Sequence, residues 1–248
     1  MTIAVIADIH ANLHALEAVL KDARQRGAER FLCLGDIVGY GAQPEECVQL
    51  IRSIDAATVL GNHDAWALRP EALAVFAVSS PVTPGLEHSR LRLSTASKRW
   101  LQHRPYTVQE WSVAGVHGGF YRPEKWPYLD SAGAARASFQ RQPTTVAFFG
   151  HTHEPGYWQE GGDRLIKPTP NYALRLGTNR RYALNPGSVG NPRTPSREAD
   201  PRAQYLLFDS DNFSVSFIRV AYDMRACITA MREAGLPEEM MSRVESGY

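Results

Sequence analysis

Long apolar runs and an export signal are both missing from this sequence of 248 residues. The longest uninterrupted apolar run covers residues 72–78, far short of the roughly 20 residues that a membrane-spanning helix needs. Met1 leads directly into the strand-like run TIAVIA, with no basic segment before it. We therefore expect neither a membrane span nor a secretory signal.

Cysteine is scarce and unpaired. The three cysteines, Cys33, Cys47 and Cys227, are an odd number and show no CxxC spacing. This pattern argues against a disulfide framework and against a zinc knuckle. A reducing cytoplasm is the expected compartment.

An excess of one charge is also missing, because 27 Lys and Arg residues face 26 Asp and Glu residues and leave a formal charge of +1. Such a balance argues against an extended nucleic-acid groove and against binding to an acidic membrane. Charged residues make up 21% of the chain and hydrophobic residues 44%. These values exclude the disordered and collagen-like classes and indicate a globular protein.

Short apolar runs and helical periods alternate in the first third of the chain. Strands are predicted at residues 3–7, 30–34 and 58–60, and helices at 13–26 and 44–54. This βαβαβ order implies parallel strands with right-handed crossovers.

The remainder of the chain divides into a helical stretch, a strand-rich stretch and a closing helix. Residues 65–104 read as a helical, cap-like insertion, and a helix at 224–234 closes the chain. Between them, short alternating runs predict a second sheet, antiparallel or mixed, with strands at 108–116, 145–149, 156–160, 164–168, 181–185, 203–208 and 214–220. No linker separates the two parts, so a single domain over residues 1–248 is expected.

Five of the eight histidines lie directly after predicted strands, beside Asp, Asn or Gly. The blocks are Asp8-Ile9-His10, Gly35-Asp36, Gly61-Asn62-His63-Asp64, Val116-His117-Gly118 and Gly150-His151-Thr152-His153. Each block alone could be a turn or a helix cap, but the strand ends of an α/β sheet are where ligands bind. Converging Asp, His and Asn without cysteine indicate divalent cations, with manganese, iron or zinc favoured.

The same five blocks resemble the calcineurin-like metallophosphoesterase superfamily, whose pattern is D-x-H, G-D, G-N-H-[DE], H and G-H-x-H. The later run at residues 185–190, NPGSVG, and the closing strand pair resemble its small bacterial branch of YfcE-type phosphodiesterases. The resemblance implies an α/β fold in which two mixed sheets form a four-layer α-β-β-α sandwich with a two-metal centre.

The resemblance also implies roles for individual residues. One cation would be held by Asp8, His10, Asp36 and His153, and the other by Asp36, Asn62, His117 and His151. Asp36 would bridge the two, and His63, paired with Asp64, would give a proton to the leaving group. Ala11 departs from the pattern, because relatives often have glycine after the D-x-H block.

Charge accounting agrees with a phosphate ligand. Two divalent cations bring four positive charges, of which Asp8 and Asp36 neutralise two and a bridging hydroxide a third. Two adjacent cations can bind phosphoryl oxygens and lower the pKa of the water between them. The neutral Asn62 preserves the positive charge that attracts the phosphate.

Two features outside these five blocks also bear on the site. The run from Pro186 to Gly190 approximates the G-x-S-x-G nucleophile elbow, but Pro186 stands where the first glycine belongs. We therefore interpret it as a turn that supports the metal site. Arg193 follows this turn closely and is a candidate substrate contact.

Together these features predict a cytoplasmic, dinuclear metal-dependent phosphoesterase with a small phosphate-ester substrate. The favoured reaction is phosphodiester hydrolysis by a metal-bridging hydroxide, with His63 as the general acid. A phosphomonoesterase and a nucleotide or dinucleotide polyphosphate hydrolase stay open. A non-catalytic scaffold of the same fold is disfavoured, because His63 and all seven ligand positions are present. The sequence leaves open the natural substrate, the metals and the oligomeric state.

Overall fold

The computed structural model describes residues 1–69, 82–168, 171–193 and 200–247. The strands are β1 (Thr2–Ile6), β2 (Arg30–Cys33), β3 (Ala57–Thr58), β4 (Thr107–Glu110), β5 (Val113–Val116), β6 (Val146–Phe148), β7 (Gly156–Gln159), β8 (Ala173–Arg175), β9 (Tyr182–Asn185), β10 (Ala203–Asp209) and β11 (Ser214–Val220). The helices are α1 (Leu13–Gln25), α2 (Pro44–Ser53), α3 (Asn62–Leu68), α5 (Thr83–Arg92), α6 (Thr95–Gln102), the 3-10 helix η1 (Pro123–Lys125), α7 (Ala132–Phe139), α8 (Met224–Glu233) and α9 (Glu238–Ser246).

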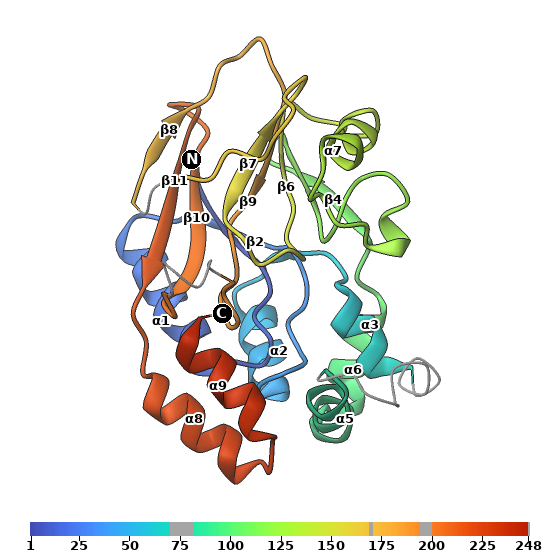
Figure 1. Ribbon diagram of the computed structural model, residues 1–248, viewed down its shortest axis with the longest axis vertical. Helices are drawn as coiled ribbons and strands as arrows, with labels where there is room; N and C mark the ends of the chain where they lie inside the picture. Colours follow the sequence, from blue (N-terminus) through green and yellow to red (C-terminus); the bar gives the residue numbers. More distant parts are fainter. Residues whose placement is uncertain (70–81, 169–170, 194–199, 248) are drawn as a thin grey trace.

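Two mixed sheets form the centre of the molecule (Figure 1). The first has the order β3-β2-β1-β10-β11-β8, and its β1, β2 and β3 run parallel, as the βαβαβ pattern predicts. The second has the order β4-β5-β6-β9-β7, in which β5, β6 and β9 run parallel and the two outer strands antiparallel.

The alternation of side chains along β1 explains how the sheets pack. Ile3 and Val5 point into the core between the two sheets, which also contains Phe148 and Leu184 of the second sheet. Ala4 and Ile6 point the other way, into the core beneath the helices. Burial on both faces is typical of a parallel strand covered by helices.

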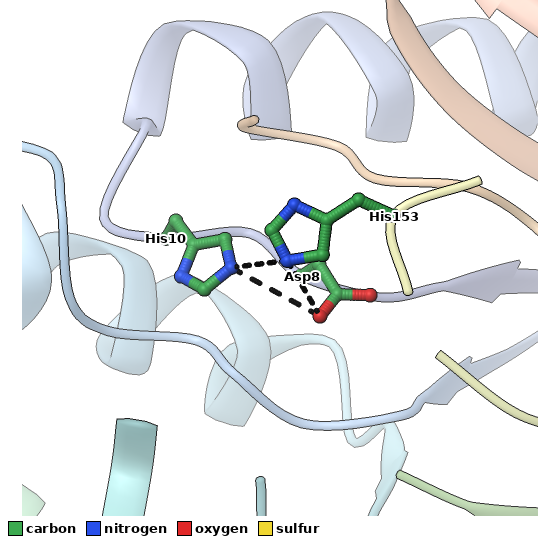
Figure 2. A group of neighbouring side chains, drawn as sticks. All are labelled: Asp8, His10 and His153. Atoms are coloured by element: carbon green, nitrogen blue, oxygen red, sulfur yellow. Dashed lines mark hydrogen bonds and ion pairs between the residues drawn. The ribbon is translucent and has the colours of Figure 1, made fainter. Parts of the chain in front are cut away.

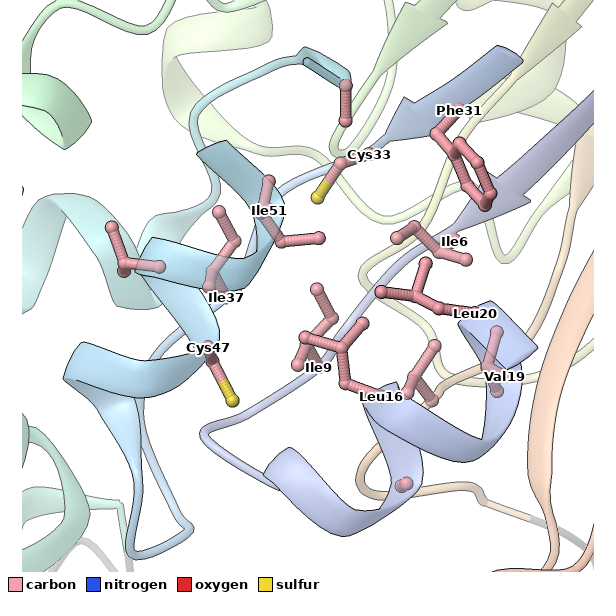
Figure 3. Close-up of a cluster of buried hydrophobic side chains, with 14 of the residues drawn as sticks. Ile6, Ile9, Leu16, Val19, Leu20, Phe31, Cys33, Ile37, Cys47 and Ile51 are labelled. Carbon is pink, nitrogen blue, oxygen red and sulfur yellow. The ribbon is translucent and has the colours of Figure 1, made fainter. Parts of the chain in front are cut away.

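The outer face of the first sheet is covered by α1 and α2. Figure 3 shows side chains of β1 and β2 meeting those of the two helices, with Ile6, Phe31 and Cys33 opposite Leu16, Val19, Leu20, Cys47 and Ile51. The buried residues of α1 recur at three- and four-residue intervals, as a helix with one apolar face requires.

The outer face of the second sheet is covered by α7, which lies on the side away from α1 (Figure 1). Ala135 and Phe139 of this helix pack against Val116, Phe149 and Trp158. The expected α-β-β-α sandwich of two mixed sheets is therefore confirmed.

Several element boundaries differ from expectation. The strand predicted at 108–116 is a hairpin, because Trp111 and Ser112 take positive φ values of 50° and 63° and reverse the chain between β4 and β5. Within the described residues, the strand predicted at 164–168 contributes only an isolated bridge between Ile166 and Tyr157. The elements α7, α9 and β8 were not predicted.

The cap-like insertion predicted at 65–104 consists, where it is described, of α5, α6 and the last part of α3. Residues 70–81 lie outside the described residues. Both α5 and α6 contact α2 and α3, so the insertion lies beside the start of α3. No helix among the described residues is long and apolar enough to span a membrane.

Candidate metal centre

The five histidine blocks all lie where strands end. Because β1, β2 and β3 are parallel, the residues that follow them emerge at the same edge of the first sheet. The parallel strands β5 and β6 do the same in the second sheet. The fold thereby gathers the seven predicted ligands, all of them buried: Asp8, His10, Asp36, Asn62, His117, His151 and His153.

One group of potential ligands joins the two sheets. Figure 2 shows the rings of His10 and His153 facing one another beside the Asp8 carboxylate. His10 Nε2 lies 3.0 Å from His153 Nε2, and His153 Nε2 lies 3.4 Å from Asp8 Oδ1. The ligand atoms of these three residues lie within 4.8 Å of one another.

A second group contains Asp36, His117 and His151, again with ligand atoms within 4.8 Å of one another. His117 Nε2 lies 3.4 Å from Asp36 Oδ2 and 2.9 Å from Asn62 Oδ1. Asn62 therefore lies beside this group, in the ligand set that the family resemblance implies.

Asp36 stands between the two groups. Its Oδ2 lies 3.4 Å from His117 Nε2 and 3.9 Å from His10 Nε2. Its other oxygen, Oδ1, accepts a hydrogen bond from the His63 backbone amide at 2.8 Å. The carboxylate is thus fixed through one oxygen while the other faces both groups, the position expected of a bridging ligand.

Three of the imidazole rings are oriented by backbone carbonyls. Nδ1 of His10, His117 and His153 lies 3.2, 2.7 and 2.6 Å from the carbonyl oxygens of Val38, Leu34 and Asn191. A ring that donates from Nδ1 presents the lone pair of Nε2, which is how histidine is prepared for a metal. With both rings in this tautomer, the Nε2 atoms of His10 and His153, 3.0 Å apart, would both be free to bind one cation.

The backbone of the site is strained in a consistent way. Asp8, His10, Asp36, His151 and His153 all have positive φ values between 50° and 68°. Such left-handed conformations are uncommon for residues other than glycine and collect at functional sites. Ala11 also has a φ of 54°, so the turn forms with alanine at the position where relatives often have glycine.

His63 lies beside the first group rather than within the predicted ligand sets. Its ring stacks on Tyr40 with a centroid distance of 4.9 Å and meets the edge of His10 at 4.7 Å. Within the described part of the chain, Nδ1 of His63 is buried and has no hydrogen-bond partner. Its ligand atoms also lie within 4.8 Å of those of His10 and Asp36.

Asp64 does not make the expected pair with His63. Its Oδ1 accepts hydrogen bonds from the amides of Ile37 and Val38 at 2.9 and 3.1 Å, and its Oδ2 accepts one from Gly61 at 3.1 Å. The carboxylate therefore fixes the turn after β2 against the start of α3. Burial, with a contribution from the charge of Asp36, raises the pKa of Asp64 to about 7.

The remaining pKa values follow from burial and from Asp36. Burial lowers the pKa of His63 to about 4 and that of His151 to about 3. Burial also opposes the charged form of His117, but the adjacent Asp36 carboxylate outweighs it and raises the pKa of His117 to about 9. The pKa of Asp36 itself is held well below its ordinary value, because the charge of His117 and its hydrogen bond outweigh burial.

The turn at 186–190 supports the site, in line with its interpretation from the sequence. The Ser188 hydroxyl donates to the Asp8 carbonyl at 2.7 Å and accepts from the Asn191 amide at 2.8 Å. The hydroxyl thereby links Asn191, whose carbonyl orients His153, to the Asp8-Ile9-His10 block. Arg193 lies just beyond, and its amide donates to the His153 carbonyl at 3.3 Å.

Two aromatic residues at the site gave no signal in the sequence. Tyr40 is buried against His10 and His63, and Tyr128 stacks on His151 with a centroid distance of 4.0 Å. Neither lies within one of the five histidine blocks. Only the tertiary fold brings them to the centre.

Comparison with known proteins identifies the family. Residues 1–212 match the calcineurin-like phosphoesterase superfamily domain. The chain belongs to this family. Calcineurin-like phosphoesterases use divalent metals, and this member carries groups of residues that could hold them. The protein is therefore a metal-dependent hydrolase of phosphate esters.

Several similar proteins match over most of the chain. An uncharacterized protein of Methanocaldococcus jannaschii is 34% identical over 250 residues, which cover 99% of this chain and 98% of that protein. The crystal structure of a metallophosphoesterase from Sphaerobacter thermophilus is 36% identical with a TM-score of 0.87, and the match covers 100% of both chains. Phosphodiesterase YfcE of Escherichia coli is 24% identical over 225 residues, which cover 87% of this chain and 91% of that enzyme.

Proposed function

We propose that this calcineurin-like phosphoesterase hydrolyses phosphodiesters at a centre of two divalent cations. The observation that carries the proposal is the approach of His10 Nε2 to His153 Nε2 at 3.0 Å, with both Nδ1 atoms directed at carbonyl oxygens. Two buried imidazoles arranged in this way are suited to share a cation.

The residues present fit two cations. Asp8, His10, Asp36 and His153 would hold one, and Asp36, Asn62, His117 and His151 the other. Mixed oxygen and nitrogen donors without sulfur favour manganese, iron or zinc. Cations held here supply a positive field for the phosphate and lower the pKa of the attacking water.

Two side chains would act on the substrate directly. His63 is proposed to donate a proton to the leaving group, since its ring lies beside the first ligand group and meets the edge of the His10 ring. Burial favours its neutral form, and the negative charge of a bound phosphate would favour the protonated form that a general acid needs. Arg193, anchored through its amide to the His153 carbonyl, would contact the phosphate with its guanidinium group.

The choice of a diester is supported by the likeness to phosphodiesterase YfcE, which extends over 87% of the chain. Phosphate monoesters and nucleotide or dinucleotide polyphosphates belong in the same substrate panel. A non-catalytic scaffold is the alternative from another functional class, and it would bind metal without hydrolysing any of them.

The experiment that tests this function compares leaving groups. An alkoxide needs a proton to depart, whereas p-nitrophenolate leaves nearly unaided. His63→Gln should therefore slow hydrolysis of an alkyl diester by roughly 10² to 10⁴, and that of a p-nitrophenyl diester distinctly less. His103→Gln is the matched control, because His103 is an exposed histidine whose ring faces the Arg99 carbonyl at the end of α6.

The outcomes separate the roles. Equal losses for both diesters would contradict the proton-donor role and indicate charge stabilisation. Loss of metal from His63→Gln would make His63 a ligand. A wild-type protein that binds metal but hydrolyses nothing in the panel would support the scaffold.

A further inference from the structure

Tyr128 covers one wall of the candidate centre. Its ring lies almost parallel to that of His151, with a centroid distance of 4.0 Å and an interplanar angle of 22°. His151 in turn belongs to the ligand group of Asp36 and His117. The tyrosine therefore stands in direct contact with a residue proposed to hold a cation.

Much of Tyr128 is nevertheless open to solvent. The residue remains 48% exposed although His151 covers one side of the ring. Because His151 covers one face, the exposed surface is drawn from the opposite face, the ring edge, the hydroxyl group and the backbone. A side chain that served only to shield His151 from water would gain more by burying both faces.

The segment that carries Tyr128 is held in place on both sides. Two residues before it, the Trp126 indole donates to the Leu60 carbonyl at 3.1 Å. The next residue, Leu129, is buried and accepts from the Trp158 indole at 2.9 Å through its carbonyl. Tyr128 is thus a fixed aromatic surface at the rim of the centre, which lowers the entropy cost of stacking a ligand on it.

We propose that Tyr128 is a specificity-determining residue on which an aromatic group of the substrate, such as a nucleobase, stacks. The inference rests on the proposed function, since it places the phosphate at the adjacent ligand groups. Stacking on Tyr128 favours phosphate esters that carry a flat aromatic substituent over those with aliphatic substituents. Stacking of a base on an aromatic side chain contributes about 1–3 kcal/mol, or roughly 5- to 150-fold in affinity.

Binding of two product-like probes tests the proposal without relying on turnover. AMP and ribose 5-phosphate share the phosphate and the sugar and differ in the base. Calorimetric titration of the metal-loaded protein should show tighter binding of AMP than of ribose 5-phosphate. Tyr128→Leu, which keeps an apolar cover over His151 but removes the aromatic face, should lower AMP affinity by about 5- to 150-fold.

Two further variants control the measurement. Tyr128→Phe keeps the ring and should retain the preference for AMP. Tyr121→Ala removes a tyrosine of similar exposure, 45%, from the same stretch of chain and should leave the affinity for both probes unchanged. Ribose 5-phosphate should bind the Leu variant within about twofold of wild type, because the phosphate contacts persist.

The result that would overturn the inference is an equal loss for both probes in Tyr128→Leu, or a wild-type protein that binds both equally. Its failure is distinct from failure of the proposed function. A wild-type protein that hydrolyses diesters but shows no preference for AMP over ribose 5-phosphate would count against Tyr128 alone. Base preference without any hydrolysis would count against the catalytic proposal alone.

Discussion

At the scale of single residues, the histidine blocks could be predicted because their spacing to strand ends is written in the sequence. The actual partners of Asp64 could not, since the family resemblance implies a pair with His63 that the structure does not show. Neighbours on a helix point about 100° apart, and both residues belong to the first turn of α3. Asp64 accordingly faces the backbone amides of Ile37, Val38 and Gly61 while His63 faces Tyr40.

Tyr40 and Tyr128 illustrate a second limit of residue-level reasoning. Tyr40 takes a φ of 57° in the turn that follows β2, and Tyr128 lies between β5 and α7. Their proximity to the centre depends on contacts between segments far apart in sequence. Aromatic residues in loops carry no periodic signal that would mark such contacts.

Asp200 gives a residue-scale prediction about stability and pH. It accepts hydrogen bonds from Arg202 and from Arg219, both at 2.7 Å, and these contacts hold its pKa well below the ordinary value. A carboxylate with a depressed folded-state pKa stabilises the fold above its unfolded pKa of about 3.9, and that contribution is lost as the pH falls below this value.

We therefore expect Asp200→Ala to lower the free energy of unfolding at pH 7 by roughly 1–3 kcal/mol. Urea denaturation at pH 7, 5 and 3 should show the difference from wild type shrinking toward acid. Asp163→Ala, at an exposed turn position, is the matched control and should change little at any pH. A constant difference for Asp200→Ala across this range would show that its charge is not the cause.

At the scale of elements, strong periodicity predicted well and tight turns did not. The helices expected at 13–26, 44–54 and 224–234 correspond to α1, α2 and α8 within one residue at each end. The β4–β5 hairpin was missed because its turn uses Trp111 and Ser112 rather than glycine or asparagine. The short strand β8 owes its existence to pairing with β11, which no local pattern reveals.

The helix α5 illustrates how one element can act on the site without contributing a ligand. A Cβ at Gly85 would lie 2.4 Å from the Tyr40 amide nitrogen, so α5 packs closely against the turn that follows β2 and contains Tyr40. The buried Ser89 hydroxyl accepts from the Gly39 amide at 3.0 Å. The same turn also contacts His63, because a Cβ at Gly39 would lie 2.3 Å from Nδ1 of His63.

This contact predicts that the cap positions His63. Gly85→Ala should push the turn toward His63 and reduce the rate with an alkyl diester by about tenfold or more, with metal content unchanged. Gly133→Ala is the matched control, because a Cβ there meets nothing within 4 Å. It should leave activity intact and stabilise the protein by about 0.5–1 kcal/mol.

Steady-state rates and elemental analysis of both variants decide the question. Full activity in Gly85→Ala would show that the turn does not guide His63. Loss of metal from the same variant would instead make the cap part of the scaffold that holds the cations.

At the scale of the whole molecule, the candidate centre exists only where the two sheets meet. The first sheet supplies Asp8, His10, Asp36 and Asn62, and the second supplies His117, His151 and His153. Contacts such as that between His10 and His153 span 143 residues of sequence. Strand order and parallel direction determine that these ends converge, and the sequence could predict this only through the βαβαβ pattern and the family resemblance.

The central claim is a centre of two cations that share Asp36. The most direct test is elemental analysis of the protein after loading with a divalent metal and removal of the excess. We predict two metals per chain in wild type, clearly fewer in Asp36→Asn, and an unchanged count in the exposed control Asp163→Asn. Two metals per chain in Asp36→Asn, or fewer than two in wild type, would contradict the claim.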